Sequence, residues 1–169
     1  MDALCLLMRE KPLDRITVQD VARRAGYNRC TFYQYFSGVG ELLGAVEDDL
    51  LAFIGERRAR AGSGGRPLVA DLASLYGERE LAVNALFGGY GNSSFLERAK
   101  ELMAERAADL DEPPIVPGGN ARRDPYLTEC RYYGSLAIFR LWLRRGRDLS
   151  PEELMKVVAD AFPTADEGR

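Results

Sequence analysis

Residues 17–36 (TVQDVARRAGYNRCTFYQYF) contain the start and stop signals of two short helices with a tight turn between them. Thr17 followed three residues later by Asp20 is the pattern of a capping box, which opens a helix. Gly26 predicts its end, because glycine readily adopts the left-handed conformation that closes helices. This spacing restricts the possible folds more than any other feature of the chain.

A second short helix is predicted to open at Asn28 and to run through Tyr35. Phe32 and Phe36 are four residues apart and form its buried edge. Two short helices joined by a turn at 26–28 match the helix-turn-helix arrangement, whose second helix enters the DNA major groove by its N-terminal residues.

The rest of the sequence also has helical periodicity, and no segment alternates like a strand. The fold class expected is all-α. Ser37 is predicted to cap a long helix, and 61–67, 88–94 and 111–120 are predicted loops. We expect two domains, a helix-turn-helix head over 1–45 and a helical body over 46–169. The other predicted helices cover residues 3–10, 68–76, 81–87, 95–110, 125–145 and 151–162.

Charge and side-chain chemistry favour DNA as the partner of the head. Residues 1–36 carry six basic and four acidic side chains, a net charge of +2, whereas the remainder has a net charge of −5. Arg29 can form a bidentate contact with guanine, and Thr31 can contact a thymine methyl group or a phosphate. Tyr33 and Tyr35 offer hydroxyl groups to phosphate oxygens. The backbone N–H groups at the Thr17 end of the first short helix form a second phosphate site.

The stretch ITVQDVARRAGYNRCTFYQYFSGVGELL (16–43) closely resembles the DNA-binding region of the TetR/AcrR family of regulators. The shared features are the threonine that opens the first short helix, the Ala-Gly before the turn, Thr-Phe-Tyr-x-Tyr-Phe and Glu-Leu-Leu. Chemistry and resemblance together nominate ten DNA-contacting residues: Thr17, Gln19, Tyr27, Asn28, Arg29, Cys30, Thr31, Tyr33, Gln34 and Tyr35.

Three positions depart from the family pattern. Val39 stands where a phosphate-contacting lysine is usual, and Cys30 replaces a customary small residue. The first helix also begins almost at Met1, without the usual basic lead-in. We expect modest DNA affinity with a strong salt dependence.

Segments 84–103 and 132–158 look like the C-terminal region of one TetR subgroup, where a glycine-containing helix with a tryptophan precedes Ser-Pro-Glu-Glu. The resemblance implies repression of transcription from a near-palindromic operator. It also implies a homodimer formed through 125–145 and 151–162, with Gly134 and Ala137 allowing close approach of the helices. The resemblance further implies a small-molecule pocket.

Aromatic residues of the body could form the walls of that pocket, although simple core packing is the alternative for each. Because residues 37–169 carry a net charge of −5, an apolar, uncharged or cationic effector is favoured over an anionic one. The candidates are Phe53, Tyr76, Phe87, Phe95, Tyr132, Tyr133 and Phe139.

Other classes of function are disfavoured. The chain contains no histidine, which argues against most hydrolase triads and zinc sites, so we expect neither an enzyme nor a metal or other cofactor. Three widely spaced cysteines indicate reduced thiols, with Cys5 and Cys130 in the core and Cys30 filling a tight spot. No membrane span or signal peptide is recognised, so a cytoplasmic location is expected. The main alternative is a helical protein-interaction module that does not bind an operator.

Overall fold

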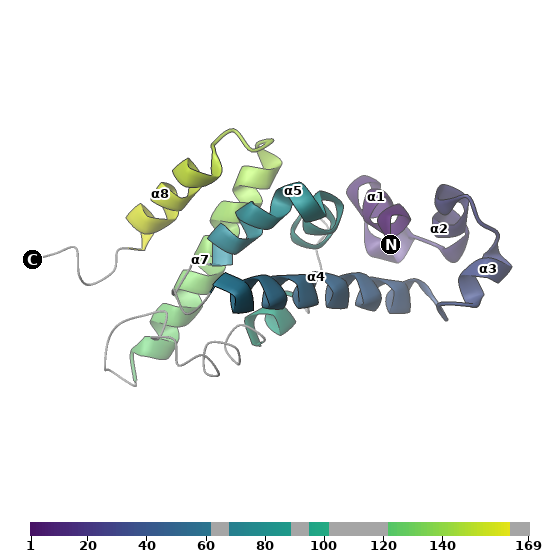
Figure 1. Cartoon of the computed structure of the whole chain (residues 1–169), viewed down its shortest axis with the longest axis horizontal. Helices are drawn as coiled ribbons and strands as arrows, with labels where there is room; N and C mark the ends of the chain where they lie inside the picture. The colour runs from purple at the N-terminus through teal and green to yellow at the C-terminus, as the bar shows by residue number, and fades with distance from the viewer. Residues whose placement is uncertain (62–67, 89–94, 102–121, 163–169) are drawn as a thin grey trace, which may run out of the picture.

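The computed structural model describes residues 1–61, 68–88, 95–101 and 122–162, and the regular structure within these ranges is entirely helical. The expected all-α class is therefore confirmed. The short helices α1 (Asp2–Glu10), α2 (Val18–Ala25) and α3 (Arg29–Tyr33) lie together at one end of the molecule, and α7 (Asp124–Arg144) and α8 (Pro151–Ala161) lie at the other (Figure 1). The long helix α4 connects the two ends. Most of the predicted loops at 61–67 and 88–94, all of the predicted loop at 111–120, and residues 102–110 of the helix predicted at 95–110 lie outside the described residues. Ala61, the first residue of the first predicted loop, is still helical as the last residue of α4.

The N-terminal helices follow their local signals closely. Helix α1 (Asp2–Glu10) ends where Pro12 forces extended backbone at Lys11, and a 3₁₀ turn, η1 (Leu13–Arg15), follows. Helix α2 (Val18–Ala25) begins with the predicted capping box of Thr17 and Asp20. It ends at Gly26, whose φ of 75° is in the left-handed region that favours glycine.

Helix α4 (Val39–Ala61) begins later than the predicted cap at Ser37 implies. Here the capping side chain is that of Glu41, because the Ser37 backbone N–H donates to Glu41 Oε2 at 2.6 Å. This hydrogen bond lowers the pKa of the Glu41 carboxyl. A carboxylate in the first turn also interacts favourably with the positive end of the helix dipole.

Helix α5 (Leu68–Phe87) joins the two helices predicted at 68–76 and 81–87 into one element with a kink at Arg79. Arg79 has φ −131° and ψ 32°, outside the helical range. Its guanidinium lies 4.6 Å from the centre of the Phe53 ring and 3.4 Å from Asp49 Oδ2, both on α4. Contacts with the neighbouring helix therefore accompany the break in regular geometry.

Residues 95–101 are helical, and α7 (Asp124–Arg144) and α8 (Pro151–Ala161) complete the body. Helix α8 has the predicted capping box, in which Ser150 Oγ accepts from the Glu153 N–H at 3.2 Å. The carboxylate of Glu153 accepts from the Ser150 N–H at 2.8 Å. Both ends of this reciprocal pair are local in sequence, which explains why the sequence pattern indicated them.

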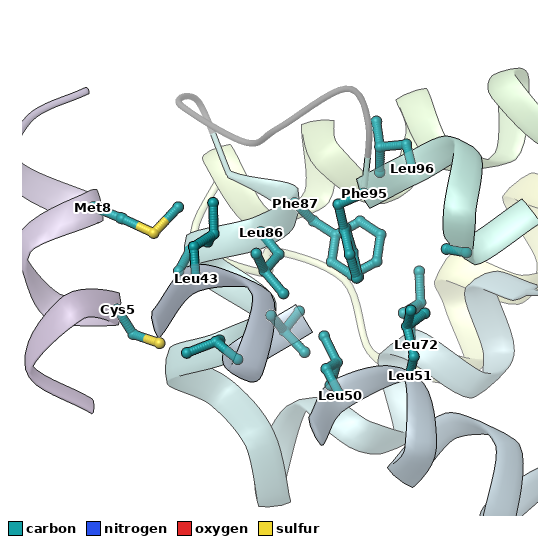
Figure 2. Packing of buried hydrophobic residues seen from close by; sticks show 14 of the residues in the cluster. Cys5, Met8, Leu43, Leu50, Leu51, Leu72, Leu86, Phe87, Phe95 and Leu96 are labelled. Carbon is teal, nitrogen blue, oxygen red and sulfur yellow. The ribbon is translucent and has the colours of Figure 1, made fainter. Parts of the chain in front are cut away.

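One continuous apolar core runs from α1 to α8. Helix α1 packs against α5 as well as α2, so the N-terminal helices are attached to the body by more than the chain connection through α4. Figure 2 shows Cys5 and Met8 on the side of α1 that faces Leu43 of α4 and Leu86 of α5. None of the described helices is long and apolar enough to cross a membrane.

Two expectations about the body are wrong. Cys130 was expected in the core but is exposed, because it lies on the outer face of α7. Gly134 does not offer an open surface to a second helix, because Phe162 of the same chain covers it. A Cβ atom added at Gly134 would lie only 2.3 Å from Phe162 Cζ.

Candidate nucleic-acid interface

Thr17, Lys11 and Asp20 form a hydrogen-bonded cluster at the N-terminus of α2. Asp20 Oδ2 accepts from Lys11 Nζ at 2.8 Å, from the Thr17 hydroxyl at 2.8 Å and from the Thr17 N–H at 3.0 Å. The hydrogen bond from Lys11, followed by those from Thr17, holds the pKa of the Asp20 carboxyl well below its usual range. Asp20 is therefore ionised at neutral pH.

The capping box changes what Thr17 can offer to DNA. Its hydroxyl accepts from the Asp20 N–H at 3.2 Å and donates to the Asp20 carboxylate, so its proton is already engaged. The first backbone bond into α2 comes from the Val21 N–H, which leaves the N–H groups of Val18 and Gln19 ahead of it at the helix end. These backbone groups are the better phosphate donors at this end of α2.

The turn and the start of α3 are fixed by Asn28. Its Oδ1 accepts from the Thr31 N–H at 2.8 Å and from the Thr31 hydroxyl at 3.2 Å, which makes Asn28 the N-cap of α3. Asn28 and Thr31 thus shape the turn, and the hydrogen bonds between them form within the chain itself, without DNA.

Helix α3 (Arg29–Tyr33) is shorter than the predicted segment 28–35. The Gln34 and Tyr35 N–H groups bond three residues back, to Thr31 and Phe32, so the last turn tightens into 3₁₀ geometry. Gln34 and Tyr35 therefore lie in the turn after α3.

The α2–α3 surface presents polar and aromatic side chains to solvent. Phe32 is buried and its ring contacts Phe36, as predicted, whereas Tyr27, Tyr33 and Tyr35 are 57–71% exposed. Of the ten nominated residues, nine are exposed and Thr31 is half-buried. All ten lie within residues 17–35, on α2, on α3 or in the turns beside them.

Cys30 and Val39 behave differently from expectation or from the family pattern. Cys30 is exposed on α3, so the idea that it fills a tight spot is wrong. Its side chain points away from the core that Phe32 fills. Val39, where a lysine is usual, is half-buried and packs against the apolar core.

Several basic side chains of this region are paired with carboxylates. Lys11 and Arg23 both contact Asp20, and Arg24 contacts Glu10 of α1. Arg29 instead donates to the amide oxygen of Gln19, a neutral partner on α2. Sequence reasoning missed this contact, because the two residues are ten positions apart and no local motif links them.

The aromatic residues nominated for an effector site lie in the body. The rings of Phe87, Phe95 and Phe139 are at most 1% exposed, and Phe87 meets the other two edge-to-face at 5.3 and 5.7 Å. Figure 2 shows Phe87 and Phe95 side by side in the core. The other four nominated rings lie under cationic side chains: Arg79 over Phe53, Arg147 over Tyr76, and Lys100 over Tyr132 and Tyr133.

Comparison with known proteins gives one match. Residues 1–46 match the family described as bacterial regulatory proteins, tetR family. No curated protein and no solved structure matches the chain. The matched residues contain α1, α2, α3 and the start of α4, which are the elements that build the exposed α2–α3 surface. Residues 1–46 therefore match the DNA-binding region of the tetR family of bacterial regulatory proteins, and this match supports a DNA-binding transcription regulator of the TetR type.

Proposed function

We propose that this regulator binds a near-palindromic operator as a homodimer and represses transcription from it, with residues 1–45 as the head and 46–169 as the regulatory and dimerisation body. The observation that carries the DNA part of the proposal is the exposed α2–α3 surface. Arg29 lies there at the start of α3 with a neutral partner, and three exposed tyrosines flank it. Arginine is the commonest reader of guanine, and tyrosine hydroxyls position a protein on phosphates.

The test of DNA reading begins with selection of an operator from randomised duplexes by the full chain. R29A should weaken binding to the selected duplex by about 1–3 kcal/mol and relax the preference at one base pair per half-site. Y33F should weaken specific and nonspecific binding alike, because phosphate contacts carry no sequence information. The matched control for R29A is R60A on α4, whose side chain is exposed far from α3 in the sequence.

Selection without any enriched duplex would overturn the proposed operator. The alternative is a helical module that binds a protein and not DNA. In that case R29A and Y33F would behave like the R60A control on every duplex, at all salt concentrations.

An exposed apolar stripe on α7 supports the homodimer. Tyr126, Cys130, Tyr133, Ala137 and Leu141 recur three or four residues apart and are all exposed in the single chain. The opposite seam, which contains Tyr132, Leu136 and Phe139, is buried within the chain. An apolar stripe of this length is costly to leave in water, and a two-fold pairing of α7 and α8 would cover it.

The dimer is tested with A137E, which puts a charge in the middle of the stripe. A52E is the matched control, because Ala52 is an exposed alanine on α4 away from α7. Light scattering at micromolar concentration should give a dimer for the wild type and A52E, and a monomer for A137E. A monomeric wild type, or a dimeric A137E, would contradict the interface.

We further assign effector binding to the aromatic residues of the body, with an apolar or cationic small molecule as the ligand. Four of these rings already lie under protein cations at 4.3–5.9 Å, so a ligand cation would replace an existing cation–π partner. Entry between Phe87, Phe95 and Phe139 would separate rings that now touch. Because α1 packs against α5, movement of the Phe87 end of α5 would reach the DNA-reading helices.

An effector can release DNA only through its different affinity for the bound and released states. A thermal-shift screen of apolar and cationic metabolites tests for one, and each hit should lower operator affinity reciprocally. Absence of any hit that moves DNA affinity would point to control by protein abundance.

A further inference from the structure

Gln19 and Arg29 meet across the turn of the helix-turn-helix. Gln19 is the second residue of α2, and Arg29 is the first residue of α3. Arg29 Nη2 donates to Gln19 Oε1, and both side chains are exposed. The contact therefore links the two helices on the surface that faces DNA in the proposed function.

The chemistry of the partner decides what this contact does to Arg29. Arg23 and Arg24 are each held by a carboxylate, which fixes the guanidinium but also cancels its charge toward DNA. The amide oxygen of Gln19 restrains the Arg29 side chain and leaves its full positive charge. In the described residues of the helix-turn-helix, Arg29 is the arginine restrained in this way.

The contact also leaves the guanine-reading geometry intact. Four of the five N–H groups of a guanidinium form two parallel pairs, one from Nε with Nη2 and one from Nη1 with Nη2, and the second N–H of Nη1 lies outside both. Gln19 occupies one proton of Nη2, and whichever proton it is, one complete pair remains for guanine O6 and N7. The oxygen of Gln19 is turned toward Arg29, which disfavours an independent bidentate contact of Gln19 with adenine.

We propose that Gln19 is a positioning residue for Arg29, and that the two form one reading unit for a single G·C pair in each half-site. This inference rests on the proposed operator binding. It departs from the sequence-based expectation that Gln19 contacts DNA independently. A long arginine side chain loses rotamer freedom on binding, and Gln19 removes part of that freedom beforehand.

The Q19A protein tests the proposal when its binding is measured on the selected operator and on duplexes that carry each single base-pair substitution in one half-site. It should weaken operator binding by about two- to tenfold, the effect of releasing one rotamer-rich side chain. Its loss of preference should fall on the same base pair that R29A relaxes. In the R29A background, Q19A should change affinity by less than about twofold, because the residue it positions is gone.

Two further variants sharpen the comparison. Q34A removes another nominated DNA contact, from the turn after α3; whatever affinity it loses, the preference at the Arg29 base pair should persist. Q19E keeps an acceptor oxygen but neutralises Arg29, so it should weaken binding to all duplexes while the preference at that base pair persists.

If Gln19 read a base pair independently, Q19A would relax the preference at a different base pair from R29A. The losses of operator affinity in Q19A and R29A would then multiply in the double variant. That result, or a Q19A that binds like the wild type, would overturn the inference while leaving operator binding intact. A readout without DNA separates the two proposals further. Nitrogen relaxation of Arg29 Nε should show greater mobility in Q19A than in the wild type, and equal mobility would overturn the positioning role whatever the DNA result.

Discussion

Replacing Phe87 by alanine tests how tightly the body is packed around the nominated effector site. The Phe87 side chain is 1% exposed, and its ring contacts Phe95 and Phe139, which come from two other helical segments. Truncation of a buried phenylalanine costs about 3–5 kcal/mol. The two edge-to-face contacts add to the loss, and neighbours fixed on separate helices restrict collapse into the cavity. We therefore expect a cost of about 4–5 kcal/mol.

The assay is urea unfolding followed by circular dichroism at one fixed protein concentration, since a homodimer gains stability with concentration. F53A is the matched control, because Phe53 is half-buried and its ring lies under Arg79. F53A should cost about 1–2 kcal/mol, from partial apolar burial and one cation–π contact.

Benzene provides a second readout for the same variant. An apolar cavity left by a missing ring stays dry and binds such ligands, so benzene should stabilise F87A and leave the wild type unchanged. Equal costs for F87A and F53A, or stabilisation of the wild type by benzene, would refute the tight packing of the three rings. The second result would also reveal a preformed cavity among the aromatic residues.

Three further predictions concern charge and thiol chemistry. Because the pKa of Asp20 is depressed in the folded protein, its contribution to stability is present above the unfolded pKa of ~3.9 and is lost as pH falls below it. D20N should therefore be less stable than the wild type at pH 7, and its urea midpoint should depend less on pH below pH 4. Parallel pH profiles of the two proteins would contradict this. Arg98 contacts the buried Glu47 and the exposed Asp48 of α4. In urea unfolding, R98A should lower the free energy of unfolding by about 1–3 kcal/mol and D48N by less than about 1 kcal/mol. Equal costs would show that the burial of Glu47 does not strengthen its contact with Arg98. Burial raises the pKa of Cys5 to about 11, so at pH 8 an aromatic disulfide reagent should label the exposed Cys30 rapidly and Cys5 only on unfolding. The C30S/C130S variant, whose remaining thiol is Cys5, is the control, and its rapid labelling in the folded state is the contrary result.

Sequence reasoning succeeded where the determining interactions are local. The caps at Thr17, Asn28 and Ser150 involve residues three positions away, and the structure contains all three. The break between 76 and 81 was visible in the apolar pattern. Its form as a kink within one helix was not, since the Arg79 side chain contacts residues of α4.

Exposure in the body was harder to predict than helix position. Helix α7 is apolar on nearly all sides, so periodicity alone could not show which seam faces the chain's own core. Burial of Tyr132 and exposure of Cys130 depend on where α5 and α8 lie. The cover over Gly134 is likewise a contact with a residue 28 positions away, Phe162.

The sequence nominates residues for the candidate DNA surface but does not show how those residues contact one another. The family pattern and side-chain chemistry identified ten positions, nine of them exposed. The hydrogen bond between Gln19 and Arg29 spans the turn and depends on how α2 and α3 are oriented. Side-chain contacts between helices follow from tertiary geometry, which a one-dimensional pattern does not contain.

The burial of α1 against α5 has a thermodynamic consequence for the whole regulator. Helices that share one apolar core tend to open together, so the DNA-reading end and the body form a single cooperative unit. If the chain binds an operator as proposed, that binding would stabilise α5 and α7 as well as α2 and α3, by an amount set by the free operator concentration relative to its Kd. By the same linkage, a cavity deep in the body reduces the fraction of molecules able to hold DNA, even when every residue of the reading surface is unchanged.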